Sequence, residues 1–191
     1  MDDYTAVTEQ PWYGYSASVQ TVTVENGVSQ IGSYAFQGCS ALASISISDS
    51  VTTLGANCLR GLASITEITL PDSITSIPGN MCRDCTSLKT IKYSDSITYI
   101  GASAFSGCNK LSGTFRIPKT VKTIGSYAFS KCNSLDGIDF QEKYNWKYCT
   151  SETATKTYSV PSSSISTPAL AKTYLTSSMN GGKVAYWFKH E

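Results

Sequence analysis

The amino-acid sequence predicts a β-rich (α+β) repeat solenoid, a stack of right-handed coils with a parallel sheet along one face. Three observations lead to this fold class. A block of about 23 residues occurs five times, each unit repeats its apolar positions, and each contains a stretch in which every second residue is apolar. Such a period is typical of coils that bury their apolar faces only against their neighbours. The units begin 23, 23, 23 and 24 residues apart, at Ile31, Leu54, Ile77, Ile100 and Ile124.

The alternating stretches are the predicted strands. In 44–48, Ile45 and Ile47 point inward while the serines between them point outward, the pattern of a half-buried strand. We expect successive strands about 4.8 Å apart in one parallel sheet. The equivalent stretches of the later units are 67–71, 90–94, 114–118 and 137–141.

The rest of each unit connects one strand to the next. A turn such as Asp49-Ser50 precedes a short return segment, 51–54. The Gly-x-x-Ala-Phe stretch that follows predicts a short helical turn on the opposite side of the coil. The fourth unit has one extra residue around 112–114, which we interpret as a β-bulge.

The repeats divide the chain into three expected parts: an N-terminal cap over 1–18, a solenoid of one half-coil and five units over 19–140, and a C-terminal capping segment over 141–191. In the last part, Thr167 as N-cap and Pro168 at the first helical position predict a short helix, and 184–188 predicts a final strand. An uncovered last coil would expose its apolar face. We expect this segment to cover it with Trp146, Leu170, Leu175, Trp187 and Phe188; the alternative is an aromatic platform for carbohydrate.

The repeat resembles the BspA-type leucine-rich repeats of bacterial surface proteins over about residues 10–140. The third unit departs from that pattern, because Met81-Cys82 replaces its Ala-Phe pair. The resemblance implies a non-catalytic bacterial module, secreted or at the cell surface, that adheres to host or neighbouring-cell components. The residues of the fourth unit that carry it are Ile100, Gly101, Ala104, Phe105, Cys108, Leu111, Ile117 and Pro118.

The seven cysteines favour packing over chemistry. Four of them occupy one inward column, and Leu62 fills that column in the second unit, so a position that accepts Leu or Cys is a core position. Cys82-x-x-Cys85 has the spacing of a zinc or redox motif, but a zinc site needs about four ligands, and the only histidine is His190. We expect neither a metal nor a cofactor. The column consists of Cys39, Cys85, Cys108 and Cys132.

Disulfides are also disfavoured within the column. Cys85 and Cys108 are expected about one strand spacing apart, which a disulfide accepts, but parallel side chains favour a ladder of thiols. The odd count leaves at least one thiol free unless chains crosslink, and Cys149 is the first candidate.

Catalytic patterns are weak. His190 lies next to the chain end, so triad schemes lack a convincing base, and we expect no enzyme. Asp49, Asp72 and Asp95 recur at 23 residues along one turn edge. Carboxylates in such a row suit Ca²⁺, but Asp-Ser is also an ordinary turn sequence, which is the interpretation we favour.

Composition excludes two partner classes. The net charge is +1 and no stripe of basic residues follows a predicted face, so we expect no nucleic-acid partner. No apolar run approaches the length of a membrane span. The N-terminus shows no signal segment. Because the proteins that the repeat resembles are exported, we expect an exported protein whose leader is absent from this sequence; the alternative is a cytoplasmic protein.

The outward residues of the strands are the candidate binding site, for a protein or glycan partner. Lys92 and Arg116 are the expected contacts. Six strands expose on the order of 300 Å², whereas a standard interface needs about 800 Å² per partner, so turns or flanking modules would have to contribute. The alternative is a passive spacer that displays another domain; the oligomeric state stays open. The central outward column is Thr23, Ser46, Thr69, Lys92, Arg116 and Asp139.

Overall fold

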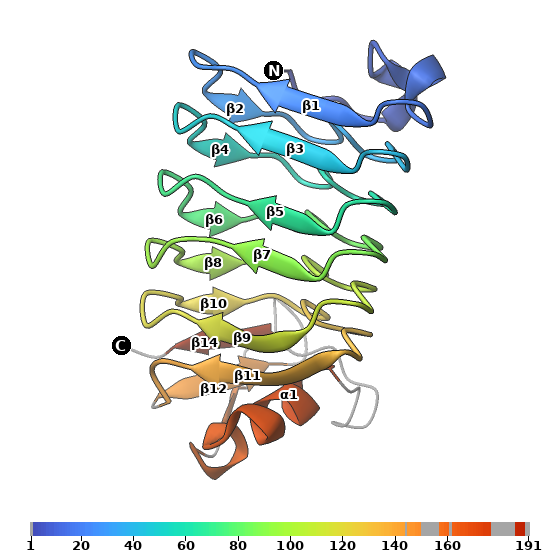
Figure 1. Ribbon diagram of the computed structural model, residues 1–191. Helices are drawn as coiled ribbons and strands as arrows, with labels where there is room; N and C mark the ends of the chain where they lie inside the picture. The colour runs from blue at the N-terminus through green and yellow to red at the C-terminus, as the bar shows by residue number, and fades with distance from the viewer. Residues whose placement is uncertain (1, 144, 150–156, 161, 177–185, 190–191) are drawn as a thin grey trace.

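The computed structural model describes residues 2–143, 145–149, 157–160, 162–176 and 186–189, and it confirms the stacked solenoid (Figure 1). One set of strands forms the front of the stack, and a second set of two-residue strands runs behind it. The front strands are β1 (Thr21–Val24), β3 (Ser44–Ile47), β5 (Glu67–Thr69), β7 (Thr90–Lys92), β9 (Gly113–Ile117) and β11 (Leu135–Phe140). The back strands are β2 (Gln30–Ile31), β4 (Thr53–Leu54), β6 (Ser76–Ile77), β8 (Tyr99–Ile100) and β10 (Thr123–Ile124).

The front strands do not form the single sheet that the sequence predicts. They pair in three separate parallel ladders, β1 with β3, β5 with β7, and β9 with β11. Within the continuously described stretch 2–143, β3 does not pair with β5, and β7 does not pair with β9. The expectation of one continuous sheet is therefore wrong.

Prolines coincide with both interruptions. In two of the paired ladders, the residue after the strand donates its N–H across to the preceding coil: Ser48 to the Val24 carbonyl and Gln141 to the Ile117 carbonyl, both at 3.0 Å. The equivalent residues after β5 and β9 are Pro71 and Pro118. Because proline has no N–H, it cannot make this bond, and its ring occupies the space of the acceptor.

The back strands show the same relation. Gly55, Gly101 and Gly125 donate their N–H groups to the carbonyls of Ile31, Ile77 and Ile100 at 2.7–2.8 Å. The equivalent residue of the third unit is Pro78, and β4 does not pair with β6, whereas β6, β8 and β10 pair in sequence. Each proline at a ladder position thus marks one interruption.

The segments that lead from each back strand to the next front strand stack into a ridge of turns at one side of the coil, which we call the turn ridge (32–39, 55–62, 78–85, 101–108 and 125–132). The predicted helical turns are wrong here: within these segments, all described, there is no helix. Each segment instead holds two residues with positive φ, four apart, such as Tyr34 (62°) with Gly38 (79°) and Asn57 (59°) with Gly61 (73°).

Bonding between coils explains why the turn ridge is not helical. Residues of positive φ alternate with residues of negative φ in each segment, so that N–H groups point along the stack. Three of these N–H groups per coil donate to the following coil. Tyr34, Phe36 and Gly38 donate to the carbonyls of Ala56, Cys58 and Arg60 at 2.8–2.9 Å. A helical segment would instead turn its N–H groups onto its own carbonyls. The same three bonds recur at every step from 57–61 to 126–130, so the turn ridge has no interruption.

The predicted bulge also lies elsewhere. Since β7 and β9 do not pair, the extra residue around 112–114 makes no bulge against the preceding strand, and Gly113 adopts a φ of 75° there. The register shift is instead in the β9–β11 ladder, where Asp136 is the additional residue between Leu135 and Gly137.

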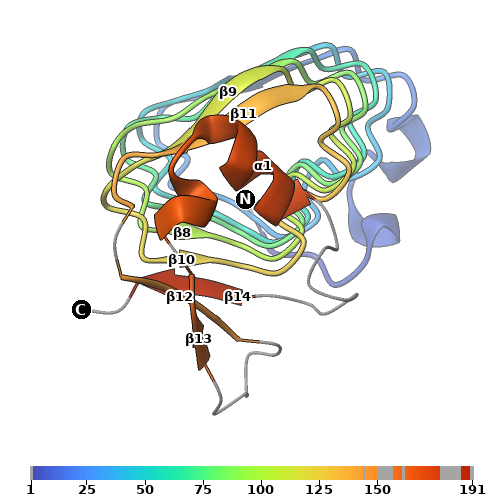
Figure 2. The same cartoon turned by 90° about the horizontal axis from the view of Figure 1, so that it is seen from below.

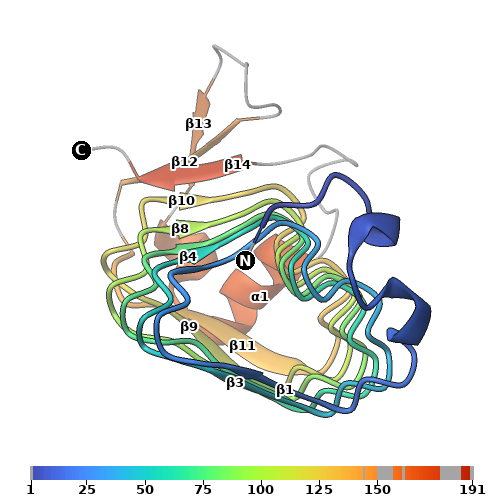
Figure 3. The ribbon, with the colours of Figure 1, turned by 90° about the horizontal axis from the view of Figure 1, so that it is seen from above.

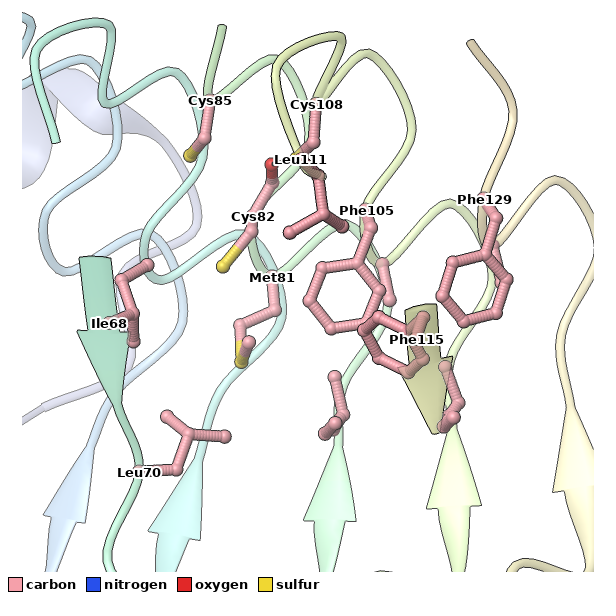
Figure 4. Close-up of a cluster of buried hydrophobic side chains, with 14 of the residues drawn as sticks. Ile68, Leu70, Met81, Cys82, Cys85, Phe105, Cys108, Leu111, Phe115 and Phe129 are labelled. Atoms are coloured by element: carbon pink, nitrogen blue, oxygen red, sulfur yellow. Dashed lines mark hydrogen bonds between the residues drawn. The ribbon is translucent and has the colours of Figure 1, made fainter. Parts of the chain in front are cut away.

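The core is a set of columns running along the stack (Figure 4). Phe105 and Phe129 are fully buried and stack with ring centroids 5.6 Å apart, while Phe36 stacks on Trp12. The phenylalanine column is interrupted between these two pairs, since Leu59 and Cys82 fill its positions in the second and third units.

The cysteine column is buried, as predicted, and its thiols are free. Three of them act as hydrogen-bond donors between coils: the thiols of Cys85, Cys108 and Cys132 donate to the carbonyls of Leu59, Cys82 and Phe105 at 3.0–3.1 Å. These bonds add to the turn ridge, and they require protonated thiols.

The N-terminal segment supplies hydrogen bonds that the first coil would otherwise lack. It holds the 3₁₀ helices η1 (Val7–Glu9) and η2 (Tyr13–Tyr15). In later coils, the turn-ridge carbonyls accept N–H groups from the coil before; in the first coil, the acceptors are Ser33, Ala35 and Gln37. Their donors are the Tyr4 N–H (3.1 Å), the Trp12 indole N–H (3.0 Å) and the Gln10 amide (3.2 Å).

At the other end, helix α1 (Pro168–Thr176) lies across the last coil against β11 (Figure 2). Thr167 caps it as predicted, since its hydroxyl accepts the Leu170 N–H at 3.4 Å. Gly137 makes this contact possible, because a Cβ there would lie 2.4 Å from the Pro168 Cβ. The contact turns Ala171 into the core and leaves Leu170 48% exposed, so the expectation that Leu170 covers the last coil is wrong.

The last strands extend the back ladder. β14 (Tyr186–Lys189) pairs antiparallel with β10 and with β12 (Trp146–Cys149), and β13 (Thr157–Ser159) follows β12 away from the stack (Figure 3). The remaining helix, η3 (Ser162–Ile165), precedes α1. Trp146 and Trp187 are each 2% exposed and pack on Phe140, as predicted for both. The side chain of Phe188 lies outside the described residues.

Candidate functional site

The six predicted site residues lie on the front face, but the interrupted ladders group them in three pairs. The strand registers place Thr23 opposite Ser46, Thr69 opposite Lys92, and Arg116 opposite Asp139. No ladder joins one pair to the next within 2–143. The predicted column is therefore three short platforms separated by two gaps.

Both predicted cations are held in ion pairs along the face. Lys92 Nζ lies 2.7 Å from Glu67 Oε1 across the β5–β7 ladder, and Arg116 donates to the Asp95 carboxylate beyond β7. All four side chains are more than 40% exposed, so each pair contributes at most about 1 kcal/mol to stability. The pairs fix where the cations stand and leave that part of the face polar.

Each gap is a crevice. The first crevice, between β3 and β5, has a volume of about 420 Å³, and the second crevice, between β7 and β9, about 270 Å³. Lys92 and Arg116 both line the second crevice, so the two expected contact residues stand on its opposite walls. Its hydroxyl groups come from Thr90, Ser112 and Thr114.

An aromatic pair lines the second crevice, and sequence analysis did not single it out. Tyr93 stacks on Phe115 with centroids 5.3 Å apart, and the Tyr93 hydroxyl donates to the Arg116 carbonyl. Burial raises the pKa of that hydroxyl above its ordinary value. The available signal was Phe115, because the other four units carry isoleucine at that position.

The structure does not support the metal-site or redox-site alternatives among the described residues. Asp49, Asp72 and Asp95 are exposed, and Asp95 is the partner of Arg116. Among the described residues, no three His, Cys, Asp or Glu side chains lie close enough to hold a metal ion. Cys82 and Cys85 are fully buried in the core. His190 and the side chain of Cys149 lie outside the described residues.

Of the helices in the described part of the chain, none is long and apolar enough to cross a bilayer.

Comparison with known proteins agrees with this geometry. A model of the BspA-type leucine-rich repeat region matches six copies, over residues 9–136 and 111–177. The chain is similar to the crystal structure of a leucine-rich cell surface protein from Faecalibacterium prausnitzii, with 32% identity over 65% of this chain and a TM-score of 0.60. It is also similar to a leucine-rich repeat protein from Bacteroides ovatus, with 28% identity over 64% of this chain and a TM-score of 0.54.

The chain covers only about a third of each of those structures, 32% and 31% of their lengths. Among curated proteins, none matches the sequence.

Proposed function

Because the chain belongs to the BspA-type leucine-rich repeat family, we propose that it is a non-catalytic binding module of a secreted or cell-surface bacterial protein. Its partner is a protein or glycan, held on the front face around the second crevice. The cell-surface description of the F. prausnitzii protein supports the location.

The observation that carries this proposal is the second crevice itself. It brings Lys92 and Arg116 onto two walls around an aromatic pair and three hydroxyl groups. Their ion-pair partners, Glu67 and Asp95, leave the cations exposed on one side, so a ligand can accept hydrogen bonds from them without burying an unpaired charge. Such a mixed surface suits polar ligands with hydroxyl or carboxylate groups.

The experiment is binding of the purified chain to an array of matrix proteins and glycans, beside a Lys92→Ala/Arg116→Ala variant. We expect a hit that the variant loses while its circular dichroism and melting temperature stay near those of the parent, since the substituted side chains are exposed. A matched control, Lys110→Ala/Lys131→Ala, removes the same charge from outside the face and should keep the hit.

A hit that survives in the Lys92→Ala/Arg116→Ala variant would place binding elsewhere on the molecule and contradict the proposal. The second candidate function is a passive spacer, which the internal ion pairs favour because they satisfy both cations without a ligand. Absence of any hit across the array would support the spacer.

A further inference from the structure

The first crevice differs from the second in how the coils around it are joined. Opposite the second crevice, the back strands β8 and β10 pair. Next to the first crevice the back is also open, because β4 and β6 do not pair. Neither ladder therefore crosses the stack at this level, and the turn ridge is the backbone connection that continues through it. The first crevice can widen without breaking a ladder.

Its walls are strand edges. In a parallel ladder, successive residues point their N–H and C=O groups to opposite sides. Ser48 bonds to β1 and Leu70 bonds to β7, so the backbone groups of Ile45 and Ile47 on one wall, and of Glu67 and Thr69 on the other, face the crevice. Such groups are a template for another strand.

The apolar lining is incomplete as well. Ile45 and Ile47 point inward yet stay partly exposed, whereas Ile68 of β5 and Leu70 directly after it are buried. An added strand with apolar residues at alternate positions would cover both isoleucines.

Two carboxylates at one end of the first crevice indicate which side chain an added strand would carry there. Asp49 and Asp72 line one end of the first crevice and are exposed. Within the stretch 2–143, all of it described, neither has an ion-pair partner, in contrast to Asp95 with Arg116. The complementary group is a Lys or Arg side chain just beyond the added strand.

We propose that the first crevice binds an extended peptide with apolar residues at alternate positions and a basic residue two positions after the last of them. The peptide pairs with the edges of β3 and β5, and its cation lies between Asp49 and Asp72. This inference goes beyond the proposed function and does not depend on Lys92 or Arg116.

The chain's own fourth unit supplies a probe. In residues 114–119, Phe115 and Ile117 occupy the apolar strand positions, and Lys119 stands where other units carry Asp49 and Asp72. The probe is the acetylated and amidated hexapeptide Thr-Phe-Arg-Ile-Ser-Lys, in which serine takes the place of Pro118 so that the backbone N–H is kept. The control peptide ends in Glu instead of Lys.

The experiment is a titration of the isotope-labelled chain with each peptide, followed by amide chemical shifts. We expect saturable shifts confined to β3, β5 and the turns after them, and binding of the Glu peptide at least ~10-fold weaker, as expected for a lost charge pair of about 1.4 kcal/mol. Asp49→Asn/Asp72→Asn should weaken the Lys peptide similarly. Asp2→Asn/Asp136→Asn removes the same charge elsewhere and should leave the affinity unchanged.

Two further variants separate this site from the proposed function. Pro71→Ser restores the missing N–H, and we expect it to close the crevice and weaken the peptide at least ~10-fold. Lys92→Ala/Arg116→Ala should bind the peptide as the parent does. Absence of binding to the folded parent, equal binding by Asp49→Asn/Asp72→Asn, or shifts centred on β7 and β9 would each overturn the proposal.

Discussion

The turn ridge and the strand ladders join the same coils, yet only the ladders are interrupted. On the turn ridge, three N–H groups per coil donate to the next coil at every step, through segments as different in sequence as 34–38 and 80–84. On the strand side, pairing fails wherever Pro71, Pro78 or Pro118 occupies a donor position. None of the turn-ridge donor positions between 34 and 107 is a proline.

The difference separates two tasks within one coil. The turn ridge, with its packed phenylalanines and thiols, holds the stack together. The strand side gives up part of its pairing and gains two crevices on its exposed face. Changes on the turn ridge should therefore lower stability strongly, and changes at the ladder prolines should act mildly and in the opposite direction.

The largest effect at neutral pH is expected from Phe105→Ala. Phe105 is fully buried and packs on Phe115 and Phe129, with centroids 5.2 and 5.6 Å away. Deleting the ring leaves a cavity and should lower the free energy of unfolding by about 3–5 kcal/mol, measured by chemical denaturation. Leu170→Ala, at an exposed site, is the control and should change it by less than about 1 kcal/mol. An unchanged midpoint for Phe105→Ala would show that the packing assigned to the turn ridge is wrong.

A smaller effect per group is expected from the buried thiols. Burial raises the pKa of Cys58 and Cys132 from 9.0 to about 12. The folded chain therefore keeps protons that the unfolded chain loses between about pH 9 and 12, so stability is fully present below pH 9 and falls as pH rises through that window. Each thiol should reduce the free energy of unfolding by about 1.4 kcal/mol per pH unit.

Denaturation curves at pH 7, 8, 10 and 11 measure this slope. Cys58→Ala is the matched control, because alanine fills the same position at Ala35, Ala104 and Ala128. In Cys58→Ala, the free energy of unfolding should fall less steeply between pH 9 and 12, by the contribution of one thiol, about 1.4 kcal/mol per pH unit. An identical slope in parent and variant would mean that Cys58 ionises as readily in the folded state as in the unfolded chain.

The sequence predicted the solenoid because a period near 23 fixes which residues share a column. It did not predict where the ladders open. Predicting the openings requires knowing which side of the strand each N–H group faces. Without that knowledge, Pro71 and Pro118 look like ordinary residues that follow a strand. The helical turns were wrong because residues such as Tyr34 and Ser103 adopt positive φ, for which their side chains give no local indication.

For the candidate site as well, the repeat spacing predicted which residues share a column but not which side chains contact one another. The column from Thr23 to Asp139 followed from alternation alone. The ion pairs of Lys92 with Glu67 and Arg116 with Asp95 join residues 25 and 21 positions apart. Such contacts depend on how long side chains lean across the face, which the repeat period does not encode. The crevices follow from the prolines and were missed with them.

The most direct test of the proline account is amide hydrogen exchange in Pro71→Ser. The restored N–H should bond to the Ile47 carbonyl, as Ser48 bonds to Val24, and draw β5 onto β3. In the closed parallel ladder the Ile47 N–H would then donate to the Thr69 carbonyl. We expect the Ile47 amide to exchange about 5 to 10 times more slowly than in the parent, because that backbone hydrogen bond adds ~1 kcal/mol. The Leu59 amide, which bonds to the Met81 carbonyl on the turn ridge, should keep its rate. Unchanged exchange of Ile47 in a folded Pro71→Ser variant would contradict the account, because the ladder would then be open for a reason other than the proline.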